Sequence, residues 1–98
     1  MIKYLENEKD FENVTKERCL VDFYADWCGP CKMLGSVLES MENSINMPII
    51  KVNTDKFPNI SAKFGIMSIP TVMIFENSKE VSKHIGYMSK EEIEDFIK

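Results

Sequence analysis

The fold is decided by residues 20–32, which read Leu-Val-Asp-Phe-Tyr-Ala-Asp-Trp-Cys-Gly-Pro-Cys-Lys. The first half is a short apolar run of the kind that forms a central strand buried on both faces. The second half places Cys28 and Cys31 three positions apart at the start of a helix-like segment. Because unpaired N–H groups give a helix N-terminus partial positive charge, they stabilise a thiolate placed there. The pattern predicts a redox site in which Cys28 is the reactive thiol.

Gly29 and Pro30 shape the turn between the two cysteines, and Pro30 suits the first turn of a helix. Cys31 lies one turn further on, close enough to close a small disulfide ring after Cys28 has reacted. Two other interpretations stay open at this point: a buried structural thiol pair, and part of a zinc site. A tetrahedral zinc site would need every Cys and His of the chain to converge, namely Cys19, Cys28, Cys31 and His84.

Length and composition favour one globular domain spanning residues 1–98. The chain is 44% apolar and 29% charged, and no run approaches the roughly 20 apolar residues that a membrane span needs. Its net charge of -4, with Lys and Arg scattered, argues against a nucleic-acid-binding protein. The first ten residues are too polar for a secretory signal, so we expect a cytoplasmic protein. Three cysteines do not make the even disulfide framework of small secreted proteins.

The other segments alternate between strand-like and helix-like patterns. We expect a capping box at Ser89 and Glu92 ahead of the last helix, and a hairpin turn around Asn77. The expected strands are 2–5, 20–25, 49–53, 71–75 and 81–86. Four helices are expected: one that begins after Asn7, one from 31 to about 45, one from 58 to about 64, and one from 89 to the end. This order, β-α-β-α-β-α-β-β-α, predicts an α/β fold with a mixed sheet.

Residues 20–32 as a whole resemble the active-site segment of the thioredoxin family. Three further features occur in the family's order: Lys51 within the run Pro-Ile-Ile-Lys-Val-Asn-Thr-Asp, Ile69-Pro70-Thr71 before an apolar run, and Gly86 before Ser89. The resemblance covers nearly the whole chain. It implies the thioredoxin fold, a three-layer α/β/α sandwich whose central mixed β-sheet of four to five strands is flanked by four helices.

One departure from the family pattern lies in the helix after the cysteines. Many members carry a proline five residues after the second cysteine, and this proline kinks the helix. Here Ser36 stands in that position and follows Gly35. The Gly-Ser pair leaves open whether the kink persists.

The resemblance implies a protein-disulfide reductase in which Cys28 attacks a substrate disulfide and Cys31 resolves the mixed disulfide. It also implies no bound cofactor and no metal, with electrons supplied by a thioredoxin reductase that oxidises NADPH. The implied partners are disulfide-containing proteins, and we expect a monomer. Oxidising and isomerising relatives usually carry His at the position of Pro30, so the Gly-Pro pair predicts a reductant.

Asp22 is a carboxylate in a strand that we expect to be buried, which is costly unless the group has a use. Burial raises the pKa of a carboxyl group, and a raised pKa suits proton transfer near neutrality. The resemblance places the family's buried acid here, as the base that deprotonates Cys31. The alternative is that Asp22 faces solvent at a strand edge. Lys51 is likewise a charge in an apolar run, and it could pair with Asp22 or extend to solvent.

A docking surface around the cysteines is implied by the resemblance. Trp27 would be partly exposed there, and the Ile69–Pro70 bond would be cis, although sequence alone gives cis only about a one-in-twenty chance at an X–Pro bond. A cis turn would aim the backbone of Ile69 at an extended substrate segment. Gly86 could instead simply end a strand. The expected substrate-binding residues are Trp27, Gly29, Pro30, Ile69, Pro70, Ile85 and Gly86.

A second class of function would use the same fold without catalysis, as an interaction module that grips a partner with its apolar face. The presence of both cysteines, of Asp22 and of the Ile69–Pro70 pair favours catalysis. Cys19 begins the strand that carries Asp22 among apolar neighbours, so we expect an inert, buried thiol there.

Overall fold

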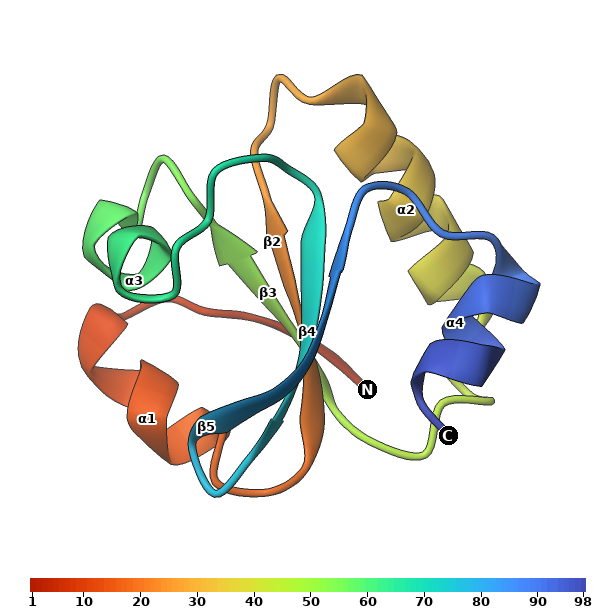
Figure 1. Cartoon of the computed structure of the whole chain (residues 1–98), viewed down its shortest axis with the longest axis horizontal. Helices are drawn as coiled ribbons and strands as arrows, with labels where there is room; N and C mark the ends of the chain where they lie inside the picture. Colours follow the sequence, from red (N-terminus) through yellow and green to blue (C-terminus); the bar gives the residue numbers. More distant parts are fainter.

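The computed structural model describes residues 1–98 as a central sheet with helices on both faces (Figure 1). As Figure 1 shows, α1 and α3 cover one face, and α2 and α4 cover the other. The elements are β1 (Ile2–Tyr4), a 3-10 helix (Glu8–Asp10), α1 (Phe11–Val14), β2 (Cys19–Tyr24), α2 (Gly29–Ser40), β3 (Ile49–Asn53), α3 (Pro58–Lys63), β4 (Thr71–Glu76), β5 (Lys79–Ile85) and α4 (Lys90–Phe96). The predicted α/β sandwich with a mixed sheet is confirmed.

The sheet has the order β1-β3-β2-β4-β5, with β2 at its centre. The β1–β3 and β3–β2 pairs are parallel, whereas β2–β4 and β4–β5 are antiparallel. The register sets Lys51 of β3 directly beside Asp22 of β2 and beside Tyr4 of β1. Three polar side chains from three strands therefore form one row across the sheet.

Alternation along β2 decides which face each side chain meets. Cys19, Val21 and Phe23 belong to the apolar cluster that includes side chains of α1 and α3. Leu20 belongs to the cluster that includes side chains of α2 and α4. Asp22, two residues after Leu20, therefore lies on the side of the sheet that α2 covers, which is the side that carries the cysteines.

The strand at Ile49–Asn53 has the expected bounds, and most other elements start or end within two residues of the expectation. The main correction concerns α2, which ends at Ser40 rather than near Ile45. Ile45 is buried all the same, because its apolar side chain is held against the core by a turn that follows the helix. The spacing of the apolar residues predicted correctly that Ile45 is buried. It did not show that Ile45 belongs to the helix, because a residue in a turn can be buried as well.

The hairpin between β4 and β5 turns at Asn77 and Ser78, which both have positive φ angles, 53° and 62°. Two successive positive φ values match the twist that two-residue hairpins need. The end of α3 is followed by Gly65 at φ 64°, a conformation that glycine adopts without strain. No helix combines the length and the apolar character needed to cross a membrane.

The expected capping box of α4 is present. The Ser89 hydroxyl accepts a hydrogen bond from the Glu92 amide at 3.2 Å, and the Ser89 amide donates to the Glu92 carboxylate at 3.0 Å. These bonds satisfy N–H groups that the helix start leaves unpaired, and they lower the pKa of Glu92 because they favour its charged form. They fix the helix that buries Ile93 against the sheet.

Replacing Ser89 by alanine is expected to reduce the free energy of unfolding by about 1 kcal/mol, because one hydroxyl acceptor of the capping box is lost. Urea denaturation followed by circular dichroism measures this change. Glu94→Ala, on the exposed side of the same helix, is the matched control and should change stability by less than about 0.5 kcal/mol. Equal effects of the two variants would contradict a specific role for the cap.

Candidate redox site

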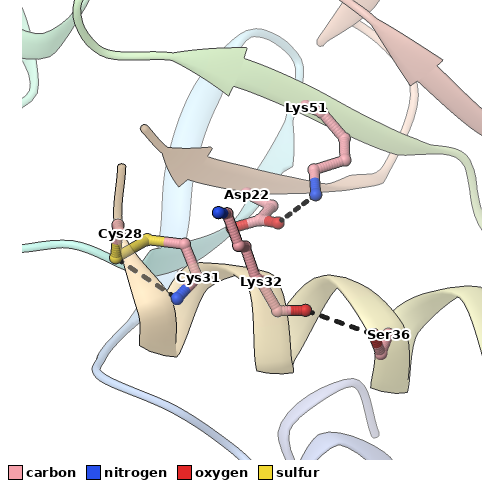
Figure 2. Close-up of polar contacts among 6 residues, drawn as sticks. All are labelled: Asp22, Cys28, Cys31, Lys32, Ser36 and Lys51. Atoms are coloured by element: carbon pink, nitrogen blue, oxygen red, sulfur yellow. Dashed lines mark hydrogen bonds and ion pairs between the residues drawn. A yellow bond between two sulfur atoms is a disulfide. The ribbon is translucent and has the colours of Figure 1, made fainter. Parts of the chain in front are cut away.

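Cys28 and Cys31 form a disulfide at the N-terminus of α2 (Figure 2). Cys28 is the N-cap of the helix, and its sulfur lies 3.2 Å from the Cys31 amide N–H, which points at it. Pro30 occupies the first turn of the helix. A backbone N–H in this turn has no partner within the helix, so the N–H that proline lacks costs no hydrogen bond. The same N–H that meets the sulfur in the disulfide is placed to donate a hydrogen bond to a Cys28 thiolate. This is the helix-terminus setting that the sequence predicted for Cys28.

The Ile69–Pro70 peptide bond is cis, as expected, and the loop before β4 that contains it lies against the disulfide. The Cys28 sulfur lies 3.8 Å from the Ile69 carbonyl oxygen, and Ile69 packs against the small cluster that contains both cysteines. The backbone N–H and C=O of Ile69 make no backbone hydrogen bond. Both groups are therefore available to a chain that docks beside Cys28.

The loop after β5 joins this surface through one backbone bond, from the Gly86 amide to the Pro70 carbonyl at 2.8 Å. Gly86 has φ 102°, a conformation that side chains rarely adopt. Its neighbours Ile85 and Tyr87 are exposed. The structure therefore brings together the 69–70 and 85–86 segments that the sequence expectation grouped.

Trp27 stands beside the disulfide with 71% of its surface exposed, in line with the expectation of a partly exposed ring. Its indole N–H donates a hydrogen bond to the Asp55 carboxylate at 2.8 Å. Asp55 follows β3 and is itself exposed. The bond anchors the ring's polar edge and leaves its apolar surface in solvent.

Asp22 and Lys51 meet between the sheet and α2 (Figure 2). The Lys51 ammonium lies 3.1 Å from one Asp22 carboxylate oxygen, and no other donor reaches either oxygen. The contact is an ion pair. Asp22 is completely buried and Lys51 is 8% exposed. The solvent-facing alternatives for both residues were therefore wrong.

The environment raises the pKa of Asp22 above its ordinary value. Burial is the largest cause, because it disfavours the charged carboxylate. The positive charge of Lys51 opposes this rise without cancelling it. Asp22 is thus a buried carboxyl group whose proton affinity depends on how close Lys51 comes.

A cavity of about 250 Å³ lies between α2 and the edge of the sheet. Tyr4, Tyr24, Cys31, Gly35 and Lys51 are among its lining residues. Because Cys31 and Lys51 line the same cavity and Lys51 contacts Asp22, this space connects the second cysteine with the buried ion pair.

Lys51 also lies close to two aromatic rings, those of Tyr24 and Tyr4. Its ammonium lies 4.7 Å from the centre of the Tyr24 ring and 5.8 Å from the centre of the Tyr4 ring, distances at which a cation is attracted to a ring face. The two rings themselves meet edge to face.

The remaining cysteine plays no part in this site. Cys19 lies on β2, facing α1 and α3, and is completely buried. Burial raises the pKa of its thiol to about 11, so it stays protonated and unreactive at neutral pH. No three Cys, His, Asp or Glu side chains lie close enough to hold a metal ion, so the zinc interpretation of the cysteines has no structural support. His84 packs edge to face on Phe96 instead.

Sequence reasoning missed four residues around the site: Tyr4, Tyr24, Gly35 and Asp55. Tyr24 could have been found, because it lies two positions after Asp22 and so shares its face of the strand. Nothing in the sequence could have placed Tyr4 or Asp55, which come from separate segments. Gly35 was noted only as a neighbour of Ser36 at the kink position. In the structure α2 runs through both without interruption, and Ser36 bonds back to the Lys32 carbonyl at 3.3 Å.

Comparison with known proteins gives one consistent result. The sequence profile of the thioredoxin family matches residues 2–98. The chain is 36% identical to a thioredoxin of Mycoplasmoides gallisepticum, over 99% of this chain and 100% of that protein. It is 39% identical to a thioredoxin of Chlamydia caviae, over 95% of this chain and 92% of that protein. The structure is similar to that of a mutant thioredoxin from Halobacterium salinarum, with a TM-score of 0.89 and 28% identity over 98% of this chain and 87% of that one.

Proposed function

The chain belongs to the thioredoxin family, and on that premise we propose that it reduces disulfide bonds in other proteins, with Cys28 attacking and Cys31 resolving. Family membership gives the chain a thiol–disulfide oxidoreductase activity that rests on a redox-active dithiol and needs no bound cofactor. Its partners are, in general terms, substrate proteins and a reductase. The observation that carries the assignment of roles is the Cys28 sulfur at the N-terminus of α2, 3.2 Å from the Cys31 amide.

The reaction transfers two electrons from the dithiol to the substrate. The Cys28 thiolate attacks one sulfur of a substrate disulfide, which forms a mixed disulfide and releases the other substrate sulfur as a thiolate that takes up a proton. Cys31 then loses its proton and attacks the Cys28 sulfur. The Cys28–Cys31 bond forms, the mixed disulfide breaks, and the second substrate thiolate leaves and is protonated.

Asp22 is the proposed acceptor of the Cys31 proton. The positive charge of Lys51 stabilises the Asp22 carboxylate and so limits the rise in its pKa. A base is useful at this step because only the thiolate attacks a disulfide. The buried position of Asp22 and its raised pKa support the role, since such a group exchanges protons closer to neutrality than an exposed aspartate does. The shared cavity lining of Cys31 and Lys51 supports the route.

The proposed substrate-binding surface surrounds the disulfide. An extended substrate segment would pair with the free backbone groups of Ile69, as an added strand does, and so present its disulfide to Cys28. Exposed apolar side chains on either side would supply contact area without demanding a particular sequence. The proposed residues of this surface are Trp27, Gly29, Pro30, Ile69, Pro70, Ile85 and Gly86.

We further propose that the chain, as a single domain of residues 1–98, works as a monomer in the cytoplasm. A thioredoxin reductase that draws its electrons from NADPH would return Cys28 and Cys31 to the dithiol. The net charge of -4 and the apolar surface around the disulfide support protein partners over nucleic acid.

The equilibrium reduction potential of the Cys28–Cys31 pair tests the proposed direction of electron flow. We expect a value near the roughly -270 mV known for thioredoxins, because Pro30 brings no positive charge to the thiolate. Titration against a dithiol couple, read by the mass shift of thiol alkylation, measures it. A value near the roughly -180 mV of protein disulfide isomerase, a difference of about 4 kcal/mol, would point to an oxidase or isomerase. If no disulfide formed at any potential, catalysis would be excluded.

Pro30→His is the matched variant for this measurement. A partly protonated histidine there would stabilise the Cys28 thiolate and so the reduced form, which shifts the potential to a less negative value. A potential unchanged by this variant would contradict the idea that residue 30 sets the direction.

A further inference from the structure

Met67 is the most exposed large apolar side chain of the protein, with 94% of its surface in solvent. Single exposed apolar side chains are normal on a protein surface, so exposure alone assigns no role to Met67. It lies in the loop between α3 and β4, two residues before the cis Ile69–Pro70 bond. The contacts of this loop decide where the thioether is presented.

The loop is anchored on both sides of Met67. The Ile66 amide donates a hydrogen bond to the Ser61 carbonyl at 2.9 Å, and the Ile66 side chain packs against the apolar cluster that includes side chains of α1 and α3. After Met67, the Ser68 carbonyl accepts a hydrogen bond from the Thr71 hydroxyl at 2.6 Å. Because the chain is fixed before and after it, the fold itself holds the Met67 side chain in solvent.

The same loop touches the disulfide. The Ile69 carbonyl oxygen lies 3.8 Å from the Cys28 sulfur, and two residues span at most about 7 Å of chain. A protein segment that pairs with the backbone of Ile69 therefore passes within reach of the Met67 side chain. Met67 extends the proposed substrate-binding surface, although the sequence expectation for that surface did not include it.

The two loops on this side of the disulfide carry no charged side chain. Residues 65–70 read Gly-Ile-Met-Ser-Ile-Pro, and residues 85–88 read Ile-Gly-Tyr-Met. Ile85 and Tyr87 are exposed, as Met67 is. Docking on this side therefore depends on apolar contact, for which a flexible thioether is well suited because it adapts to different partners. A polar group in place of the thioether would weaken that contact.

Methionine is also the side chain of this loop that peroxides oxidise. The sulfur attacks one peroxide oxygen, an S–O bond forms and the O–O bond breaks. The sulfur loses two electrons, which the peroxide gains. The proton on the transferred oxygen passes to the departing hydroxide, which leaves as water. The product, methionine sulfoxide, is polar, and a methionine sulfoxide reductase converts it back to the thioether.

The seven methionines of the chain differ in exposure, so a peroxide does not reach them equally. Met1 and Met33 are exposed, though less than Met67, with 62% and 59% of their surfaces in solvent. Three others lie in the core with at most 1% of their surfaces exposed, namely Met41, Met73 and Met88. Of the exposed three, Met67 alone is on the loop that contacts the Cys28 sulfur.

We propose that Met67 is an oxidation site that regulates docking, where a peroxide forms the sulfoxide and the polar S=O group weakens the binding of protein disulfides. This inference rests on the proposed function, in which protein substrates dock around Cys28. Met67 is not part of the cluster around Cys28 and Cys31, so the exchange chemistry of the two sulfurs is unchanged. Oxidation of Met67 therefore discriminates against protein substrates and spares small disulfides, which need no docking surface.

The test starts from the full chain in its disulfide form, because the Cys28–Cys31 bond leaves neither sulfur as a thiolate for the peroxide to oxidise. Hydrogen peroxide is added and then removed with catalase. Peptide mass spectrometry should find one added oxygen on Met67 and none on the buried methionines. With a chemical dithiol as electron source, the KM for a protein disulfide should rise about three- to tenfold at constant kcat. Neither constant should change for a small-molecule disulfide.

Three variants make the test specific. Met67→Leu keeps the apolar contact but has no sulfur, so its KM should not respond to peroxide. Met33→Leu, which removes an exposed sulfur from α2, is the matched control and should respond as the unmodified protein does. Met67→Gln places a polar group of similar length at the same position, and it should raise the KM for the protein disulfide without any peroxide.

Two results would overturn the proposal. One is a Met67 sulfoxide that forms while the KM for the protein disulfide stays at its original value. The other is a rise in KM that persists in Met67→Leu, which would place the sensitive group elsewhere. The proposed function fails on a different observation, namely an untreated protein that reduces the small disulfide but no protein disulfide.

Discussion

Replacing Cys28 by serine is expected to abolish disulfide reduction, lowering kcat/KM for a protein disulfide by at least about 10³-fold. A serine hydroxyl is not ionised at neutral pH, so the helix N-terminus and the Cys31 amide have no anion to stabilise. The loss is measured by following substrate thiols released with a chemical dithiol as the electron source. Cys19→Ala is the matched control, since that thiol is buried on the other face of the sheet, and it should keep full activity.

Cys31→Ser completes this prediction, because it separates the two cysteines by role. The Cys28 thiolate can still attack, but no second thiol resolves the product, so a covalent Cys28–substrate adduct should accumulate. Mass spectrometry detects the adduct, and reduction with a dithiol removes it. A non-catalytic interaction module would behave differently, because its partner binding would survive Cys28→Ser unchanged. Adducts forming on Cys31 in the Cys28→Ser protein would reverse the assignment of roles.

Asp22→Asn is expected to stabilise the fold by about 1–3 kcal/mol at pH 7 while slowing catalysis. The carboxylate is fully buried, and apart from the contact with Lys51 nothing compensates for its lost hydration. Asparagine has the same shape without the charge. Lys51, left without its partner, can turn into the neighbouring cavity and be hydrated, so the usual cost of an orphaned buried charge is reduced.

The pH dependence of this gain follows from the direction of the pKa shift. The pKa of Asp22 is raised in the folded state, so between the unfolded value of about 3.9 and the folded value the native protein binds more protons than the unfolded chain. The contribution of Asp22 to stability is therefore greatest at low pH and falls as pH rises through this window. The stability difference between Asp22→Asn and the unmodified protein should vanish near pH 3.5 and level off above the folded pKa. Urea denaturation across this pH range measures it.

The kinetic half of the prediction concerns Cys31. An ordinary thiol is only a few per cent ionised at pH 7, so losing its base should slow mixed-disulfide resolution by roughly 10- to 30-fold. At alkaline pH the thiol ionises without help and the difference should disappear. Single-turnover mass spectrometry resolves this step from the first attack. A variant that gained stability but resolved mixed disulfides at the original rate would show that Asp22 is a structural residue.

Local patterns predicted much of this protein from the sequence. Apolar runs and turn residues located the five strands, and the Ser89–Glu92 pair located the start of α4. These features depend on residues within one helical turn or one hairpin of each other, which is why the sequence shows them directly. The pattern of residues 20–32 likewise placed Cys28 at a helix N-terminus, since strand, turn and helix follow one another without a break. The resemblance to the thioredoxin family added the cis bond before Pro70.

The tertiary structure alone decided what surrounds the cysteines. Pairing of β2 with β3 in one register set Lys51 beside Asp22, and a shift by one residue would have turned either side chain to the opposite face of the sheet. The cavity that Gly35 and Lys51 both line, and the approach of the Lys51 ammonium to the Tyr4 ring, join segments far apart in the chain. By itself, the sequence determined which residues could react and which strands and helices carry them. Their proton affinities were decided only by the packed fold, because burial and the distance between charges exist only once the chain has folded.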